Sequence, residues 1–488
     1  MKIRYFFLVL VIVVFGVIYV NSRNQERWVA CKINNHTALK DMLEQDSINE
    51  KKVYNKKDKL ELKSKSACVY DCNSKRVLYS KNSDERLPMA STTKIMTCIV
   101  ALENANLEDI CTISSYAASM PDVQLNAVKG EKFKLGDLLY SLMLESHNDV
   151  AVAIAEHIGK LLCNKNEKEE AISEMKNDLK YDNDYDMKNR KNNILNNNDD
   201  EYNRINNVEI SKKYVAYFAK LMNKKAKELG LKNTNFVTPN GLDAEKHYTT
   251  AVELAKIAAY AIENKEFLKI TNTPSYTFKS DKGRSYTVNN KNQFLNNYNG
   301  AIGCKTGYTS KAGYCFVGAI NQCCGNVDKC SKGQKNKYKL VSVVLGCGWP
   351  PHKTYKWQDT KKQTENVINN FSTKEVVIDS TILNGKKISI ENGLDDSEIQ
   401  PYINESFSIL LNDKDKISVN SKLIKKIVAP VKKGQIIGYV DVMINGIEYK
   451  RIYIRCKKNV KKLTYTKKFT ELLHFFTFSL IDTSLNNV

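Results

Sequence analysis

The sequence changes character near Phe371, and this change constrains the fold more than any other feature. Before it, segments with helical spacing of apolar residues alternate with short strand-like segments. After it, residues 374–456 show alternating β-branched residues and no helical spacing. Three Asn-Gly pairs mark turns between these strands: Asn384-Gly385, Asn392-Gly393 and Asn445-Gly446. We therefore predict an α+β domain at 65–370 and a small all-β C-terminal domain at 371–458.

The predicted α+β domain contains both element types in mixed order. Helices are expected at 91–103, 135–144, 150–162 and 214–229, and strands at 67–71, 76–79, 276–278, 286–288, 313–320 and 338–345. Helices packed around a central antiparallel sheet bury the apolar faces of both element types. Residues 164–207 interrupt this pattern, because Asn, Lys, Asp and Glu dominate there. They carry too little apolar surface to offset the entropy of ordering, which predicts a flexible insertion.

The N-terminus predicts export from the cell. Residues 1–22 combine a short basic start with an apolar run from Tyr5 to Val20. That pattern is typical of an export signal or a membrane anchor, and a polar spacer follows at 23–64. The formal net charge of +21, from 75 Lys and Arg against 54 Asp and Glu, would suit nucleic acid or an anionic surface. Export excludes nucleic acid and favours a membrane or cell-wall polymer, at the outer face of the cytoplasmic membrane.

The C-terminal tail, residues 459–488, predicts a second membrane contact. Lysines precede an apolar stripe with helical spacing: Phe469, Leu472, Leu473, Phe476 and Leu480. A basic amphipathic helix of this kind is typical of segments that lie on a membrane surface. A helix docked on the all-β domain is the alternative.

The cysteines do not predict a disulfide scaffold or a metal centre. The chain has 13, an odd number, and they are scattered. Cys323, Cys324 and Cys330 lie close together, but no fourth ligand is near them in sequence. Loop thiols or a local disulfide are the favoured interpretations, and no metal is expected.

Ser91 and Lys94 form a Ser-x-x-Lys element at the start of a predicted helix. Positions i and i+3 share one helix face, so the amine can reach the hydroxyl. A serine becomes a good nucleophile when a base removes its proton, and lysine can be that base when burial or a nearby cation lowers its pKa. The element alone is weak, because Ser173 and Lys176 repeat it inside the predicted insertion.

Two further short motifs follow in order. Ser146, His147 and Asn148 form a Ser-x-Asn element, which by itself could equally be a polar helix cap. Lys305-Thr306-Gly307 is the single Lys-Thr-Gly in the chain and could equally be a turn with a solvated lysine. Together, in this order, the three motifs are the combination found in penicillin-binding proteins and class A β-lactamases.

Longer segments around the motifs resemble low-molecular-mass D-Ala-D-Ala carboxypeptidases, the penicillin-binding proteins of peptidase S11 type. The matching segments are 87–97, 238–243, 247–251, 303–314 and 428–435. The resemblance covers most of residues 65–460 and implies a serine β-lactamase/transpeptidase-like fold. The sequence departs from the family pattern at 164–207, at 321–337 and at His147, where a small residue is common. We interpret His147 as a tolerated middle residue and not as a base.

The resemblance also implies roles for the first two motifs. Ser91 would attack the penultimate D-Ala carbonyl and release the terminal D-Ala, with Lys94 as general base. Ser146 and Asn148 would shuttle protons and orient the base.

The third motif would bind the substrate. Lys305 and Thr306 would hold the substrate carboxylate, and Gly307 would allow close approach. The backbone N–H groups of Ser91 and Tyr308 would form the oxyanion hole. Peptidoglycan stem peptides would be the substrates and β-lactams the acylating inhibitors, with no cofactor.

Three alternatives remain. A β-lactamase would share the motifs, but no convincing Glu-x-x-x-Asn element lies between Ser146 and Lys305. A D,D-endopeptidase or transpeptidase would use the same nucleophile with another acceptor. A non-enzymatic β-lactam-sensing, wall-binding protein would be favoured by a missing motif residue, and all are present.

Overall fold

The computed structural model describes residues 60–163, 199–323, 337–394, 398–464, 466–467 and 469–470. The chain divides into two compact units, with the boundary after Thr373 and the short stretch Leu410–Asn412 assigned to the first unit. This boundary falls close to Phe371, where the sequence changes character. The two units are described separately below.

A five-stranded sheet forms the centre of the first unit. Its strands are β1 (Ser66–Asp71), β2 (Arg76–Lys81), β7 (Ala301–Thr309), β8 (Gly313–Cys323) and β9 (Lys337–Leu345). Their order is β2-β1-β9-β8-β7, and each neighbouring pair is antiparallel. β7 is therefore an edge strand, with one side free of sheet hydrogen bonds from the described residues.

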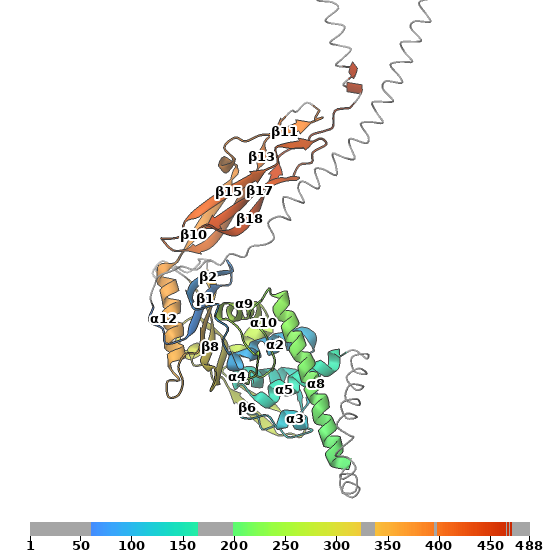
Figure 1. Cartoon of the computed structure of the whole chain (residues 1–488), viewed down its shortest axis with the longest axis vertical. Helices are drawn as coiled ribbons and strands as arrows, with labels where there is room; N and C mark the ends of the chain where they lie inside the picture. Colours follow the sequence, from blue (N-terminus) through green and yellow to red (C-terminus); the bar gives the residue numbers. More distant parts are fainter. Residues whose placement is uncertain are drawn as a thin grey trace, which may run out of the picture. The chain divides into compact units, whose positions relative to one another are not determined.

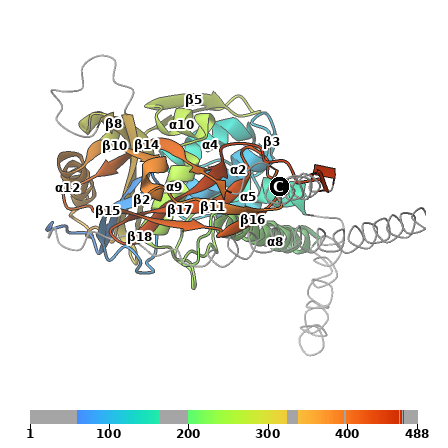
Figure 2. The same cartoon turned by 90° about the horizontal axis from the view of Figure 1, so that it is seen from above.

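Helices cover both faces of this sheet. The main group consists of α2 (Lys94–Asn104), α4 (Leu135–Leu144), α5 (Asn148–Leu162), α8 (Asp199–Glu228), α9 (Ala251–Ala261) and α10 (Lys265–Thr271). α9 packs on β1 and β9 from this side, whereas α12 (Tyr355–Asn370) packs on β8 and β9 from the other. Figures 1 and 2 both show the sheet between α12 and the main group. The predicted α+β class, a helix-flanked antiparallel sheet, is confirmed.

Short elements complete the first unit. They are η1 (Ala90–Thr93), β3 (Ile110–Thr112), α3 (Ser115–Ala118), β4 (Lys132–Lys134), β5 (Ser275–Lys279), β6 (Ser285–Asn289) and α11 (Phe294–Asn297). β3 pairs with β4, and β5 pairs with β6.

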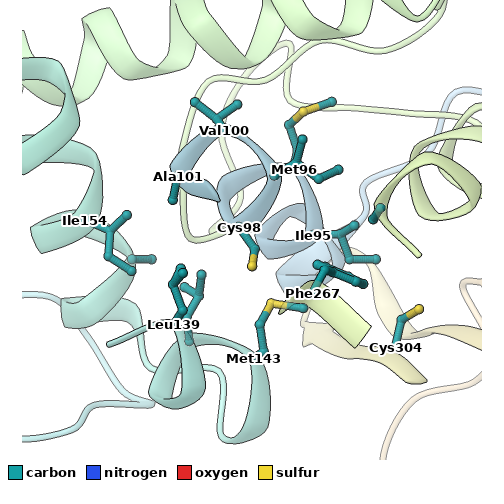
Figure 3. Packing of buried hydrophobic residues seen from close by; sticks show 14 of the residues in the cluster. Ile95, Met96, Cys98, Val100, Ala101, Leu139, Met143, Ile154, Phe267 and Cys304 are labelled. Atoms are coloured by element: carbon teal, nitrogen blue, oxygen red, sulfur yellow. The ribbon is translucent and has the colours of Figure 1, made fainter. Parts of the chain in front are cut away.

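The core of the first unit surrounds α2. Figure 3 shows Cys98 of this helix pointing toward Leu139 of α4 and Ile95 lying beside Phe267 of α10, with Met96 on the opposite side of the helix. Each of these five side chains is at most 1% exposed. Full burial of a large apolar side chain stabilises a fold by about 1.5–3 kcal/mol. This packing holds α2 firmly in place, and with it the backbone of Lys94, the first residue of the helix.

Two predictions differ most from the structure. The helix predicted at 91–103 begins with the 3-10 turn η1 and becomes α-helical at Lys94. α8 begins at Asp199, so residues 199–207, the end of the predicted insertion at 164–207, are helical. Residues 164–198 lie outside the described structure.

The second unit is all-β, as predicted. Its strands are β10 (Ser372–Asp379), β11 (Ile388–Glu391), β12 (Glu398–Ile399), β13 (Pro401–Tyr402), β14 (Asn404–Leu411), β15 (Ile417–Leu423), β16 (Lys426–Val428), β17 (Ile436–Ile444) and β18 (Ile447–Cys456). A short 3-10 turn, η3 (Ser380–Leu383), interrupts them. β17 and β18 form a hairpin in which Asn445 and Gly446 have φ values of 53° and 80°, as a type I′ turn requires.

The predicted terminal segments fall mainly outside the described residues. This applies to 1–22, to most of the spacer 23–64 and to 471–488 of the tail. Within the described ranges, no helix is both long and apolar enough to cross a membrane. The side chains of Cys323, Cys324 and Cys330 also lie outside the described structure.

Candidate active site

The three motifs lie on three different parts of the first unit. Ser91 belongs to η1 and Lys94 begins α2, whereas Ser146 and Asn148 lie where α4 passes into α5. The Lys-Thr-Gly element lies on the edge strand β7. The tertiary structure brings these parts together, although 214 positions separate Ser91 from Lys305 in the chain.

Lys94 is at the centre of the site. Its Nζ atom lies 3.0 Å from Ser91 Oγ and 2.9 Å from Asn148 Oδ1. A third contact joins it to the backbone oxygen of Asn240 at 2.5 Å. The side chain is 0% exposed. The amine therefore bridges the nucleophile, the second motif and a segment of the chain that no motif predicted.

The electrostatics favour a neutral Lys94 amine. Burial lowers its pKa well below the usual value, and the charge of Lys305 lowers it further, while Asp149 acts in the opposite sense. A neutral amine has a lone pair that can accept the Ser91 proton. The arrangement can thus generate a nucleophilic serine without a histidine.

Lys305 supplies positive charge beside this base. Its side chain is 1% exposed, and its Nζ atom donates to the backbone oxygen of Thr306 at 3.1 Å. Burial, followed by the nearby charge of Lys356, lowers its pKa to about 7. Lys305 therefore changes between its charged and neutral forms near neutral pH.

Gly307 explains how β7 can approach the nucleophile. A Cβ atom at this position would lie 2.9 Å from Ser91 N and 3.1 Å from Ala90 Cβ. The first distance is shorter than real Cβ contacts and the second is tight, so a side chain here would displace the backbone of the nucleophile turn. The edge of β7 and the nucleophile turn together form one wall of the site.

Asn148 is held in one orientation. Its Nδ2 atom donates to the backbone oxygens of Pro121 and Asp122, each at 3.1 Å, and its backbone N–H donates to Val123 O at 2.7 Å. With the amide nitrogen so engaged, Oδ1 faces Lys94. The neighbouring Ser146 has φ +75°, a left-handed conformation that is strained for a residue with a side chain. Its Oγ is buried and has no hydrogen-bond partner within the described chain.

A segment that carries none of the three motifs completes the site. Asn240 O also accepts from Ser91 Oγ at 3.4 Å. Gly241 has φ +83°, and a Cβ atom there would fall 2.0 Å from Ala90 O, so a side chain would displace the turn. A backbone acceptor leaves no residue signature, but the family-like segment 238–243 was the available signal.

His247 is the side chain whose role sequence reasoning missed. Its Nδ1 accepts from the backbone N–H of Val237 at 3.0 Å, so its Nε2 carries the hydrogen. That Nε2 lies 2.9 Å from Thr93 Oγ1, and the Thr93 hydroxyl donates to Ala90 O at 2.8 Å. Burial lowers the pKa of His247 to about 4, which keeps it neutral. This chain of bonds holds the residue before the nucleophile.

Metal and thiol chemistry have no assembled site among the described residues. No group of three or more His, Cys, Asp or Glu side chains in those ranges could hold a metal ion. The nine described cysteines that can be assessed are free thiols.

Two family profiles match the chain. One, described as D-alanyl-D-alanine carboxypeptidase, matches residues 51–192 and 211–346. The other, described as the C-terminal domain of penicillin-binding protein 5, matches residues 371–462.

Individual proteins give the same picture. The D-alanyl-D-alanine carboxypeptidase DacF of Bacillus subtilis is 26% identical over 416 residues, which cover 83% of this chain and 88% of the relative. A D-alanyl-D-alanine endopeptidase of Pseudomonas aeruginosa is 28% identical over 262 residues, 53% of this chain and 67% of the relative. The structure of penicillin-binding protein 5 from Haemophilus influenzae is similar with a TM-score of 0.57 and 24% identity. It covers 83% of this chain and 100% of that one.

Proposed function

Because the chain belongs to the D-alanyl-D-alanine carboxypeptidase family, peptidase S11, we propose that it removes the terminal D-Ala from peptidoglycan pentapeptide stems through an acyl-enzyme on Ser91. One observation carries the assignment of residues. The amine of Lys94 is buried, which lowers its pKa, and it lies 3.0 Å from Ser91 Oγ, within reach of the hydroxyl proton.

Acylation begins when neutral Lys94 accepts the Ser91 proton. The serine oxygen then attacks the carbonyl carbon of the penultimate D-Ala and forms a tetrahedral oxyanion. The backbone N–H groups of Ser91 and Tyr308 donate to this oxyanion, each contributing roughly 3–4 kcal/mol in comparable acyl-transfer sites. The C–N bond to the terminal D-Ala breaks, and its nitrogen takes a proton that Lys94 delivers through Ser146.

Substrate binding and deacylation use the remaining groups. Lys305 and Thr306 bind the terminal carboxylate, which places the scissile carbonyl over Ser91. After D-Ala leaves, water attacks the ester carbonyl, Lys94 takes a proton from that water, and Ser91 recovers its hydrogen. A β-lactam acylates Ser91 in the same way, but its ring opens without losing a leaving group. The whole molecule therefore stays attached to Ser91, and β-lactams act as inhibitors.

Domain coverage favours a carboxypeptidase over the enzymes that share its nucleophile. Carboxypeptidase relatives match up to 83% of the chain, whereas at about half of the chain both an endopeptidase (53%) and a carboxypeptidase (50%) match. A non-enzymatic β-lactam sensor that is acylated would need the same bonds from Lys94 to Ser91 and Asn148, so release of product is what distinguishes an enzyme from a sensor.

The assignment is tested with the purified enzyme and four substrates. We expect stoichiometric labelling by fluorescent penicillin and catalytic release of D-Ala from a soluble pentapeptide. Rapid turnover of the penicillin would instead identify a β-lactamase. Cleavage of a cross-linked dimeric peptide in preference to the pentapeptide would identify an endopeptidase. Transfer to an added D-amino acid in preference to water would identify a transpeptidase, and labelling without any product would identify a sensor.

The place of action follows from the same assignment. Peptidoglycan lies outside the cytoplasmic membrane, and carboxypeptidases with this C-terminal domain act at the cell wall. We propose that residues 1–22 and the basic tail 459–488 hold the enzyme at the outer face of the cytoplasmic membrane, where the net charge of +21 would favour anionic lipids. Release of the protein from membranes after removal of both segments would support this placement.

A pH profile tests the role of Lys305. The charged form of Lys305 binds the carboxylate, so the acylation rate constant should fall as pH rises through its pKa of about 7. Lys356, whose own pKa burial lowers to about 8, repels that charge. Replacing Lys356 with methionine should raise the pKa of Lys305 and move the alkaline limb to higher pH. Second-order acylation by fluorescent penicillin, measured against pH, provides the readout.

Lys361→Met is the matched control for this profile. Lys361 lies on the same helix, is 57% exposed and pairs with Glu365 at 3.7 Å. The Lys361→Met variant loses one positive charge, but that charge does not act on Lys305. Equal shifts in the two variants would contradict the specific effect of Lys356.

A further inference from the structure

We propose that His147 is a positioning residue for Ser146, and that it fixes the turn from which the Ser146 hydroxyl serves the acyl transfer. This proposal rests on the proposed function. It concerns the middle residue of the Ser-x-Asn motif, which has no part in the mechanism above.

The His147 ring is built into the protein on both sides. Its side chain is 5% exposed. Nδ1 lies 2.7 Å from the hydroxyl of Ser141, in α4, and Nε2 lies 3.4 Å from Glu145 Oε2. Both nitrogens therefore have partners, so the ring is not free to act as a base.

Glu145 extends the connection to a second part of the fold. Its Oε1 atom accepts from the backbone N–H of Asn289 at 2.8 Å and lies 3.2 Å from Lys291 Nζ. Asn289 is the last residue of β6. The imidazole thus joins the end of α4 to the segment after β6, and Ser146 lies between these two attachments.

Ser146 needs such support because its backbone is strained. Its φ of +75° costs on the order of 1–3 kcal/mol for a residue with a side chain. Its own bonds are few: the backbone N–H donates to Ser141 O at 3.2 Å, and the buried Oγ has no partner in the described structure. The surroundings must therefore hold the turn, and the contacts of His147 are the ones adjacent to it.

The charges around the ring favour a neutral imidazole in this role. Burial lowers the pKa of His147, and the Lys94 amine acts in the same direction, whereas Asp149 and Glu145 oppose it. A neutral ring can accept from the Ser141 hydroxyl and donate toward Glu145. Glutamine can make both contacts without titrating, whereas glycine can make neither.

The experiment compares His147→Gly with His147→Gln in the full-length protein. Fluorescent penicillin gives two quantities: the fraction of molecules labelled at completion and the rate of labelling. We expect full labelling in both variants, a rate about 10-fold to 100-fold lower in His147→Gly, and a rate near wild type in His147→Gln. A general loss of folding would lower the labelled fraction instead. His157→Gln on α5, where His157 lies 3.6 Å from Asp109, is the matched control and should leave both quantities unchanged.

A double-mutant cycle separates positioning of Ser146 from other effects. If His147 acts through Ser146, then His147→Gly should slow labelling much less in a Ser146→Ala background than in the wild type. An equal slowing in both backgrounds, or an unchanged rate in His147→Gly, would overturn the proposal. A rate in His147→Gln as low as in His147→Gly would also overturn it. Failure of wild-type protein to label at all would refute the proposed function and is a distinct result.

Discussion

Replacing Ser91 with alanine is expected to abolish both penicillin labelling and D-Ala release, by on the order of 10⁶-fold as in other serine hydrolases that lose their nucleophile. Neighbouring hydroxyls cannot substitute. Thr92 Oγ1 donates to Met89 O at 2.6 Å, and Thr93 Oγ1 donates to Ala90 O at 2.8 Å, so both are committed to the turn. The Ser91 side chain accounts for the site's chemistry and for little of its packing, so the variant should remain folded.

The measurement is covalent labelling followed on a denaturing gel, together with D-Ala release from a soluble pentapeptide. Ser173→Ala is a sequence-matched control, because Ser173 begins the second Ser-x-x-Lys element of the chain. It should label at the wild-type rate. Labelling that persists in Ser91→Ala would assign the nucleophile elsewhere.

Replacing Lys94 with arginine is expected to lower the acylation rate constant by about 10²–10⁴-fold, the usual contribution of a general base. Arginine keeps donors for Asn148 Oδ1 and Asn240 O, but it carries a positive charge where the lysine amine is neutral. It cannot take the Ser91 proton, because a guanidinium stays protonated at every accessible pH. The variant therefore distinguishes a role of Lys94 as a base from a role as a positive charge. Stopped-flow acylation by fluorescent penicillin gives the rate constant.

The pH dependence adds a second readout for Lys94. Protonation removes the base, so the wild-type rate should fall as pH drops through the lowered pKa of Lys94. Replacing Lys305 with methionine should raise that pKa, since the charge of Lys305 contributes to the lowering. The acid limb should then move to higher pH. Lys129→Arg is an exposed control with no expected effect on rate. A wild-type rate in Lys94→Arg would show that Lys94 acts as a cation and not as a base.

Elements with a clear contrast between apolar and polar positions were predictable. The bounds predicted for α4 are those of the structure, and every strand predicted in the first unit is present. α9 gave no such contrast, because alanines and buried residues lie almost all around it. α12 was hard to predict for the opposite reason, because several of its buried residues are polar, including Asp359, Thr360 and Gln363.

β7 shows why a motif can be more informative than a strand propensity. Its nine residues include Gly303 and Gly307, which weaken any strand pattern. The Lys-Thr-Gly motif nevertheless identified Lys305 and Thr306 as candidate binding residues, although no strand was predicted there. The structure shows β7 at the edge of the sheet.

The sequence by itself determined which residue types perform the chemistry and in what order they occur. Ser91, Lys94 and Lys305 belong to motifs whose side chains suit acyl transfer, and side-chain identity is written directly in the chain. It also determined the change from an α+β domain to an all-β domain, because hydrophobic periodicity is a local property.

Only the tertiary structure decided the state of those groups. Burial and the proximity of Lys305 lower the pKa of Lys94, and both depend on how distant segments pack. The backbone oxygen of Asn240 and the bond from His247 to Thr93 are equally invisible to a motif, because they join positions about 150 residues apart. A nucleophile can be recognised from local sequence, but its activation depends on desolvation and charge, which only the folded chain creates.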